Sequence, residues 1–349
     1  MKVLFVESVL TGHRAVYHSA LINGVGNESS VLIMPEKENK IKCKQVVDKD
    51  INLRPKNLKD YKNWIDYICK IANQEQTDVI HFLDGDILYK FFGFYMSSLR
   101  DYKVIITFHH IADDLAHSIS VNRIVRKNRI GIVHTDTLNN RFKNNRNIRL
   151  IDYPYFPTGS ISNRDDARRY FQISDEKTVY LSLGGTRYEK GLDILVEAFQ
   201  KVDRKDAVLL IAGKEEYFKR EDIERLNINH KDIIYHLGYL SSEEWNLALA
   251  ASDVVVLPYR KSFSGASGPL VEAVWFKKYI IGKDDSSVGE MIRTHKLGEV
   301  FEAENIESLA RTLNSVATDF DKNNLKYRTF RERISLELFR SKYISLYKE

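Results

Sequence analysis

Residues 258–281, PYRKSFSGASGPLVEAVWFKKYII, decide the fold class of this chain. The segment predicts the end of a buried strand, a loop of small residues, the start of a helix and a second strand. Pro269 suits the first helical position, because its fixed φ and missing N–H cost nothing there. The unpaired N–H groups of the helix then face a loop of short side chains, an arrangement that binds anions. The loop residues are Ser262, Ser264, Gly265, Ala266, Ser267 and Gly268.

Glu272 follows Pro269 by about one helical turn. A carboxylate at that position can accept hydrogen bonds from the neighbouring hydroxyls of a ribose. Phosphate together with ribose indicates a nucleotide. Loops of Gly and Ser also precede helices where they only turn the chain, and this segment alone leaves that interpretation open.

A second segment, LSLGGTRYEKGLDILVEAF at residues 181–199, predicts a strand, a glycine turn and an amphipathic helix. Gly184 and Gly185 are followed by Arg187 and Lys190 in the loop. Arg can bind two phosphate oxygens while Lys supplies a compact charge, so the pair suits a diphosphate. Solvated loop charges are the alternative, since most Lys and Arg side chains are exposed.

Together these segments resemble the retaining GT-B glycosyltransferases, specifically glycosyltransferase family four (glycosyl transferases group 1), and the resemblance extends over nearly the whole chain. The family motif Gly-x-x-Arg-x-x-Lys-Gly is matched by Gly184, Arg187, Lys190 and Gly191. The resemblance implies that Arg187 and Lys190 hold the donor diphosphate beside Gly185 and stabilise charge on the departing nucleotide. These two residues are therefore the expected catalytic cations.

The family's later signature is a Glu, seven residues and a second Glu, and here Glu272 fills the second position. The first position holds Ser264, so the contact that usually grips a donor-sugar hydroxyl is shorter and uncharged, which leaves the donor sugar open. By resemblance, the donor contacts of this segment are Ser264, Gly265, Ala266, Ser267, Gly268, Pro269, Leu270 and Glu272.

Three further apolar runs, at residues 207–213, 233–240 and 252–258, predict parallel strands buried on both faces and separated by helices. Ligands of such sheets bind at the carboxyl ends of the strands. Tyr239 and Leu240 follow one of these runs, and the resemblance implies that their main chain contacts the nucleotide base.

The N-terminal half begins with a strand at residues 2–6, and Gly12 and His13 in the loop after it match the family's glycine loop, which faces the donor phosphates and sugar. A plain turn with a surface His is the alternative. The strand at residues 104–108 ends in His109 and His110, and by resemblance His109 contacts the donor sugar near the reacting carbon. His81 is expected to be a structural residue.

The expected architecture is α/β, the GT-B fold, with two Rossmann-like domains facing a central cleft and a C-terminal helix that crosses back to the N-terminal domain. Residues 1–157 form the expected acceptor domain, joined by the returning helix at about 327–349, and residues 158–326 form the donor domain. The 349 residues, 43% of them hydrophobic, suffice for two such cores.

No metal or other cofactor is expected, because no Cys or carboxylate cluster with ligand spacing accompanies the paired histidines. The N-terminus predicts a strand and not a signal peptide, and no apolar run is long enough to span a bilayer. With two cysteines and no sign of a disulfide framework, the expected compartment is the cytoplasm, at or near the inner face of the cell membrane.

Residues 1–150 hold 23 Lys and Arg against 16 Asp and Glu, whereas the rest of the chain holds 30 against 32. A basic N-terminal half suits peripheral association with an anionic membrane and a saccharide or lipid-linked saccharide acceptor. The expected membrane contacts are the surface cations Arg123, Arg126, Lys127 and Arg129. The aromatic run Phe91, Phe92, Phe94, Tyr95 and Met96 is a candidate apolar companion, with a place in the core as the alternative. Nucleic acid is not an expected partner, because no reading motif accompanies the basic residues.

The resulting hypothesis is transfer of a sugar, with retention at the anomeric carbon, from a nucleotide-diphosphate sugar, a UDP-sugar being favoured, to the acceptor. A non-catalytic glycosyltransferase-like subunit that binds nucleotide or glycan and assists a partner enzyme is the alternative, motivated by Ser264. A nucleotide-sugar epimerase on a similar fold is a weaker third.

Overall fold

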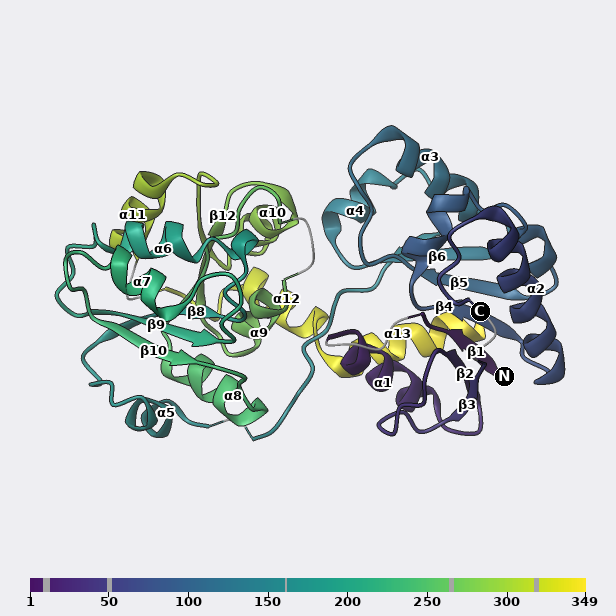
Figure 1. The fold of residues 1–349 in the computed structure, drawn as a ribbon, viewed down its shortest axis with the longest axis horizontal. Coiled ribbons are helices and arrows are strands. Elements are labelled where there is room, and N and C mark those ends of the chain that lie inside the picture. The colour runs from purple at the N-terminus through teal and green to yellow at the C-terminus, as the bar shows by residue number, and fades with distance from the viewer. Residues whose placement is uncertain (9–12, 49–51, 161, 264–266, 317–319) are drawn as a thin grey trace. The chain divides into compact units, whose positions relative to one another are not determined.

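The computed structural model describes residues 1–8, 13–48, 52–160, 162–263, 267–316 and 320–349 (Figure 1). These residues divide into two compact units, Met1–Phe156 with Ser335–Glu349 (unit 1) and Pro157–Ile334 (unit 2). Each unit is a parallel sheet with helices on both faces, the arrangement of a Rossmann-like α/β domain.

The seven strands of unit 1 have the order β3-β2-β1-β4-β5-β6-β7, and every neighbouring pair is parallel. The strand order reverses between β1 and β4, where open sheets of this type bind their ligands. The elements of unit 1 are β1 (Val3–Val6), α1 (His13–Val25), β2 (Ser30–Met34), β3 (Lys44–Val47), α2 (Leu58–Gln74), β4 (Val79–Phe82), the 3₁₀ helices η1 (Gly85–Phe91) and η2 (Met96–Leu99), β5 (Lys103–Thr107), α3 (Leu115–Ile124), β6 (Arg129–Val133), α4 (Asp136–Arg141), β7 (Ile148–Leu150) and α13 (Leu336–Lys348).

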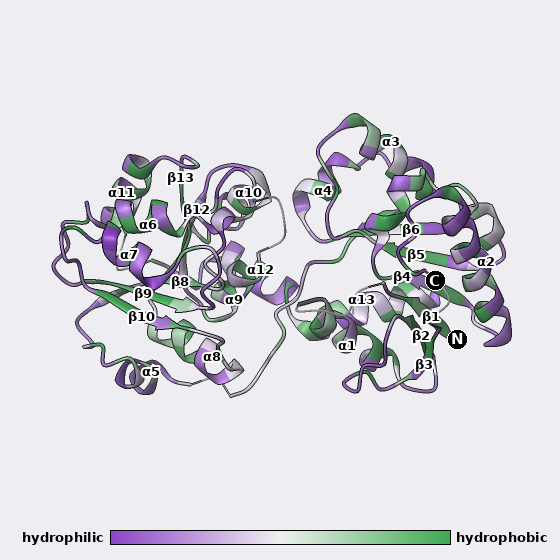
Figure 2. Ribbon diagram, in the orientation of Figure 1, coloured by the Kyte–Doolittle hydropathy of each residue, from purple (hydrophilic) through white to green (hydrophobic). Residues whose placement is uncertain are grey.

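Strands β1 and β4 of this sheet are buried on both faces, whereas the edge strand β3 is partly exposed, and Figure 2 shows the apolar character of the inner strands. Side chains alternate along β1: Leu4 and Val6 pack beneath α2 and α3, whereas Val3 and Phe5 pack beneath α1 and α13. The last helix is therefore part of the unit 1 core, although it is distant in sequence.

Unit 2 repeats the design with six parallel strands in the order β10-β9-β8-β11-β12-β13, and the order reverses between β8 and β11. Helices α6, α7 and α11 cover one face and α8 and α9 the other. The elements of unit 2 are α5 (Arg164–Tyr170), β8 (Thr178–Leu183), the 3₁₀ helix η3 (Tyr188–Lys190), α6 (Leu192–Phe199), β9 (Ala207–Gly213), α7 (Arg220–Leu226), β10 (Ile233–Leu237), α8 (Ser242–Ala251), β11 (Val254–Leu257), α9 (Gly268–Trp275), β12 (Tyr279–Lys283), α10 (Ser286–His295), β13 (Gly298–Phe301), α11 (Ile306–Asn314) and α12 (Leu325–Arg333).

Two features differ from the sequence predictions. The strand predicted at residues 233–240 ends at Leu237 and is only half-buried, because β10 is an edge strand with β9 as its one neighbour. The single helix predicted at about 327–349 is two helices: α12 belongs to unit 2, and α13 begins anew in unit 1 after Ser335, whose side chain accepts the Leu338 N–H at 3.3 Å.

Hydrogen bonds between buried side chains fix α13 on the unit 1 sheet. The Tyr343 hydroxyl lies 2.7 Å from that of Tyr17 and 3.0 Å from Thr107 Oγ1. His81 bridges Tyr347 and Thr107 through its two ring nitrogens, at 2.7 and 2.9 Å. His81 is thus a fully paired structural residue, and burial holds its pKa well below the ordinary value.

Candidate functional site

The two segments singled out in the sequence meet in unit 2, at the carboxyl ends of β8 and β11. These strands are hydrogen-bonded neighbours at the point where the strand order reverses. Their loops touch: Arg260 N donates to Glu189 O at 3.0 Å, and a Cβ at Gly191 would overlap the carbonyl oxygen of Pro258. Gly191 also has φ +65°, so two requirements favour glycine there.

Residues 258–263, which follow β11, are held by two cations that sequence reasoning missed. The Arg260 guanidinium binds both oxygens of Asp193, at 3.0 and 2.6 Å, and donates to Tyr188 O at 2.9 Å. The buried Lys283 ammonium donates to the carbonyls of Arg260 and Phe263 at 3.0 and 2.8 Å. The available signal was a lysine that directly follows the apolar run of β12, because a charge buried at such a position needs partners.

Lys190 lies against aromatic rings and close to the beginning of α9. Its ammonium is 4.0 Å from the ring centre of Tyr259 and 4.6 Å from that of Phe263, which are cation–π distances. The Tyr259 hydroxyl lies 3.0 Å from Ser267 Oγ, which accepts the Leu270 N–H at 3.2 Å and so caps α9. The predicted phosphate cation and the predicted helix start therefore share one small region, which also contains Gly268 and Pro269.

Arg187 lies in a more open position, with 51% of its side chain exposed. Its Nε is 3.1 Å from Glu189 Oε1 and 3.7 Å from Glu216 Oε2. A Cβ at Gly185 would overlap the Glu216 carboxylate, so the absence of a side chain at Gly185 makes room for it. An anion that binds Arg187 must replace these carboxylates or rearrange them.

Glu272 receives a hydrogen bond that the sequence did not reveal. Its Oε2 accepts from Trp245 Nε1, on α8, at 2.9 Å. Burial raises the pKa of Glu272 to about 7, while the Trp245 bond and the Lys190 charge act in the opposite direction. Glu272 can thus change its charge state near neutral pH, which fits a functional role.

The remaining predicted donor contacts of unit 2 divide into two groups. Tyr239 and Leu240 follow β10, and the Tyr239 side chain is 91% exposed, so it is not packed in the core. Ser264, Gly265 and Ala266 lie outside the described residues, so the departure of Ser264 from the family signature has no structural description.

In unit 1, His109 lies just beyond β5. Its Nε2 donates to Leu83 O at 2.9 Å, and its backbone N–H donates to Asp86 Oδ1 at 3.2 Å. The ring contacts Tyr17 and His134, with centroids 5.3 and 5.4 Å away. His13 is the first residue of α1, and Gly12 lies outside the described residues.

The neighbours of His109 are mainly uncharged. His134 donates from Nδ1 to Ile151 O at 2.6 Å, and burial lowers its pKa to about 4. Burial also raises the pKa of Tyr17 well above the usual value. Deeper in the unit, Glu7 Oε2 and His18 Nε2 pair at 2.8 Å.

Across the described ranges, no group of three or more His, Cys, Asp or Glu is placed to hold a metal ion. The helices within those ranges also include none with the length and apolarity to cross a bilayer.

Comparison with known proteins bears on the family and the fold of the chain. Residues 163–331, inside unit 2 and slightly under half of the chain, match the family model of the glycosyl transferases group 1. An uncharacterised glycosyltransferase of Methanocaldococcus jannaschii is 30% identical over 96 residues, 26% of this chain and 24% of that protein. The chain thus spans about a quarter of that curated relative.

Solved structures resemble the chain over its whole length. A glycosyltransferase from Rickettsia africae matches with a TM-score of 0.75 at 17% identity. The match covers 99% of this chain and 97% of the Rickettsia chain. HepE of Anabaena, solved in complex with UDP, has a TM-score of 0.74 at 13% identity, with 99% of both chains covered. The predicted GT-B fold class is confirmed. The family match and the fold match together support the assignment of a GT-B glycosyltransferase.

Proposed function

We propose that this chain is a retaining, family-four hexosyltransferase that moves a sugar from a nucleotide-diphosphate sugar to a saccharide or lipid-linked saccharide acceptor. A place in bacterial polysaccharide or glycoconjugate synthesis is part of the proposal. The observation that carries it is the convergence of Lys190, the capped start of α9 and Glu272 at the carboxyl edge of the unit 2 sheet. Cation, helix N-terminus and carboxylate match the diphosphate and ribose of one ligand.

In the proposed reaction, the bond between the anomeric carbon and the β-phosphate oxygen breaks, and the acceptor oxygen bonds to the same face of that carbon. The acceptor proton passes to the departing phosphate. Lys190 and Arg187 stabilise the negative charge that grows on this phosphate, and no side chain acts as nucleophile. Glu272 holds the ribose, and His109 shapes the sugar pocket.

UDP is the favoured nucleotide, because HepE of Anabaena was solved with UDP and with UDP-glucose. A thermal-shift panel of UDP-, GDP- and ADP-sugars tests this choice, since a ligand at 100 times its Kd stabilises by about 2.7 kcal/mol. The protein with Lys190→Ala serves as the control, because a nucleotide bound elsewhere would still shift its Tm.

Activity is measured as nucleotide released with and without acceptor, and the anomeric configuration of the product by NMR. Nucleotide release that requires the acceptor separates a transferase from an accessory subunit or an epimerase, and an inverted product would contradict retention.

We propose that no divalent cation takes part, because Lys190 and Arg187 supply the positive charge. Turnover in EDTA should therefore equal turnover with added Mg²⁺.

Peripheral membrane association is a further part of the proposal, and it rests on an exposed patch of unit 1. Leu115 and Ile119 on α3 are 76% and 53% exposed, and Arg123 follows on the same helix face, with its guanidinium 5.1 Å from the ring centre of Phe94. Exposed aliphatic groups beside a cation suit an anionic bilayer surface.

Several residues expected at the membrane are not available for it. Arg129 is only 8% exposed, and its Nε donates to Arg126 O. Phe91 and Met96 are buried in the unit 1 core, whereas Phe92, Phe94 and Tyr95 are exposed. Flotation with anionic vesicles tests the patch: Leu115→Ser with Ile119→Ser should reduce binding, and unchanged binding would remove the patch from the proposal.

A further inference from the structure

A polar pocket of about 510 Å³ opens in unit 1, away from the strand ends that carry His109. Two loops form it: residues 125–128 lead into β6, and residues 142–147 lead into β7. It therefore lies at the amino edge of the sheet. His134 follows the carboxyl end of β6, and the five residues of that strand put about 16 Å between the two edges.

The residues that line the pocket are four cations, four asparagines and two apolar residues, with no carboxylate among them. Arg126, Lys127 and Arg146 are exposed and have no ion pair with any described residue. Arg141 differs, because its guanidinium donates to the carbonyls of Ala112 and Asp114 at 2.8 and 2.9 Å. Three positive charges thus line one pocket without a protein counter-charge among the described residues.

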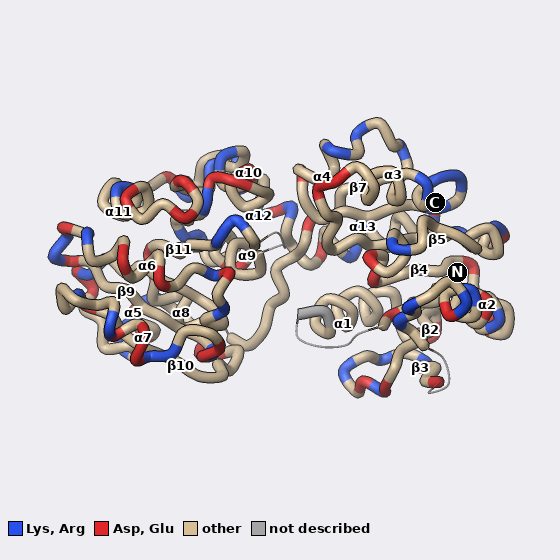
Figure 3. Tube along the Cα trace, turned by 45° about the horizontal axis from the view of Figure 1, so that its top comes forward, with Lys and Arg blue, Asp and Glu red and all other residues tan. Residues whose placement is uncertain are grey.

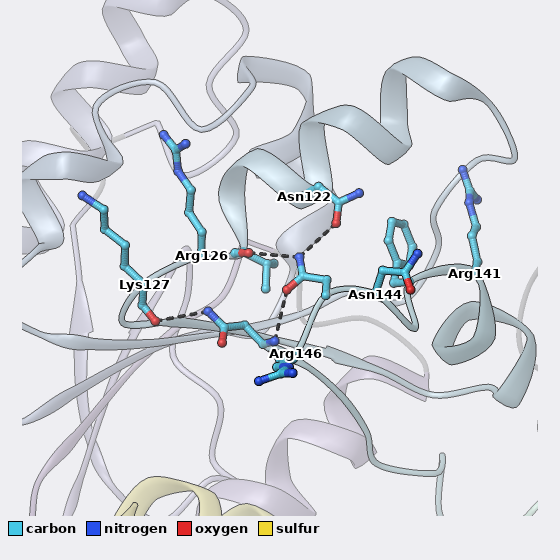
Figure 4. Close-up of a pocket in the computed structure, with 10 residues that line it drawn as sticks. Asn122, Arg126, Lys127, Arg141, Asn144 and Arg146 are labelled. Atoms are coloured by element: carbon cyan, nitrogen blue, oxygen red, sulfur yellow. Dashed lines mark hydrogen bonds between the residues drawn. The ribbon is translucent and has the colours of Figure 1, made fainter.

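Figure 4 shows Arg126 and Lys127 extending in the same direction from their loop, with Arg141 apart from them beyond Asn144. Figure 3 shows that Lys and Arg also gather along the loops near α3, α4 and β7. Burial lowers the pKa of the neighbouring Arg129, and the charge of Arg126 lowers it further.

The loops that carry these cations are held by asparagine side chains. Asn145 Nδ2 donates to Asn122 Oδ1 at 2.9 Å and to Val125 O at 3.1 Å, and its Oδ1 accepts the Asn147 N–H at 3.1 Å. Asn147 Nδ2 donates to Lys127 O at 3.1 Å, which supports the left-handed backbone of Lys127, φ +59°. A non-glycine residue in that conformation needs such support.

A solvated basic surface does not require loops held by asparagine hydrogen bonds, since long cationic side chains usually extend into water from ordinary helix surfaces. Here uncharged amides order two loops so that unpaired cations share one hollow. Guanidinium and ammonium groups together suit a tetrahedral anion with several acceptor oxygens.

We propose that this pocket is a second anion site, which binds the phosphate of a phosphomonoester or diphosphate group through Arg126, Lys127 and Arg146. It is separate from the proposed donor site in unit 2 and does not depend on the sugar-transfer reaction. The phosphate can belong to a soluble compound or to a lipid headgroup, and both present the same chemistry.

The test uses the full chain with Arg187→Ala and Lys190→Ala, so that the proposed donor site does not take up the probe. Pyrophosphate is titrated calorimetrically at low salt, and flotation is measured with phosphatidylcholine vesicles that contain phosphatidic acid or, at equal charge, phosphatidylserine. The pocket variant adds Arg126→Gln, Lys127→Gln and Arg146→Gln, and each single change should weaken binding roughly tenfold.

The matched control adds Lys59→Gln, Lys90→Gln and Arg100→Gln, which remove the same charge from exposed residues of unit 1 outside the two loops that form the pocket. Pyrophosphate binding lost only in the pocket variant identifies a soluble phosphate compound. Selective loss of flotation with phosphatidic acid identifies a lipid headgroup. Equal weakening of binding in the pocket and control variants would show diffuse charge attraction and overturn the proposal. The absence of binding to either probe would also overturn it.

Discussion

The carboxyl edges of the two sheets share a topology and differ in chemistry. Each edge lies where the strand order reverses, between β1 and β4 in unit 1 and between β8 and β11 in unit 2. Unit 2 gathers Arg187, Lys190 and a Glu272 that titrates near neutrality, whereas in unit 1 the rings of Tyr17 and His134 beside His109 are buried and held neutral, and Asp86 accepts the His109 backbone N–H.

Under the proposed function, this difference corresponds to a division of labour within one repeated fold. A site for a diphosphate needs cations and exposed main-chain N–H groups, because negative charge increases there as the bond breaks. A site for uncharged hydroxyl groups needs hydrogen-bonding rings without net charge, because a fixed charge would only add desolvation cost. We therefore expect charge changes to matter most in unit 2.

The largest expected effect is that of Lys190→Ala on turnover. Loss of one preorganised positive group at a departing anion should reduce kcat by about 10² to 10³, with a smaller change in the KM for donor. Arg187→Ala should reduce kcat by a smaller factor, because the Arg187 side chain is half-exposed and already pairs with Glu189 and Glu216. The measurement is steady-state nucleotide release at saturating donor.

Arg225→Ala is the matched control for these variants, since Arg225 is an exposed cation of unit 2 that pairs with Asp222 on α7. Its kcat should equal that of the wild type. Near-normal turnover in Lys190→Ala would end the assignment of this edge to the diphosphate.

Glu272→Gln should have the next largest effect, on nucleotide affinity. Hydrogen bonds to a charged acceptor contribute roughly 1.5 to 3 kcal/mol, so binding of UDP should weaken about 10- to 100-fold. In the wild type, affinity should rise as the pH rises towards about 7, because only the carboxylate accepts from both hydroxyls, and level off above it. The variant should lack this step.

Calorimetric titration with UDP from pH 5.5 to 8.5 checks both expectations. The UDP phosphate also titrates in this range, and subtracting the profile of Glu272→Gln from that of the wild type removes its contribution. Trp245→Phe deletes the Nε1 donor that lowers the pKa of Glu272, so the step should move to higher pH. A wild-type profile parallel to that of Glu272→Gln would place Glu272 outside the nucleotide site.

The sequence predicted the parts of this edge that follow from local pattern. Apolar runs and glycines place β8, β9, β11 and the start of α9, since strand and helix periods are visible within short windows. Trp245 and Arg260 could not be predicted as site residues, because their partners Glu272 and Asp193 are 27 and 67 residues away. Tertiary folding alone brings such pairs together.

The same limit explains the errors in unit 1. Arg129 was expected to be a surface cation, but the fold places it at the start of β6, between β5 and β7, where it is buried. The break between α12 and α13 was hidden, because apolar residues continue at helical spacing on both sides of Ile334 while the two helices pack in different units. Helical period does not reveal which core a helix joins.

A smaller effect is expected for His109→Ala. In the proposed role the imidazole contacts the donor sugar through ordinary hydrogen bonds, so turnover should fall roughly tenfold while the Kd for free UDP stays nearly constant. His117→Ala is the control, because His117 pairs with Asp114 on the exposed beginning of α3. An equal loss of UDP affinity and turnover would show that His109 supports the fold and not the sugar.

The smallest expected effect is on stability, and it has opposite signs in the two units. The folded pKa of His134 is lowered to about 4, so its contribution is present above about 6.5 and is lost as the pH falls towards 4. The folded pKa of Glu272 is raised to about 7, so its contribution is present below about 4.5 and is lost as the pH rises towards 7.

Between pH 7 and 5.5, the change in the His134 contribution to the free energy of unfolding should be about 1 kcal/mol, a shift of about 2 to 4 °C in Tm. His134→Asn keeps a donor for the Ile151 carbonyl and should remove this acid-side loss, whereas Glu272→Gln should remove the loss on the other side. Melting curves of the three proteins across pH 4.5 to 7.5 measure both slopes, and a His134→Asn protein as acid-sensitive as the wild type would contradict the neutral character assigned to the edge of unit 1.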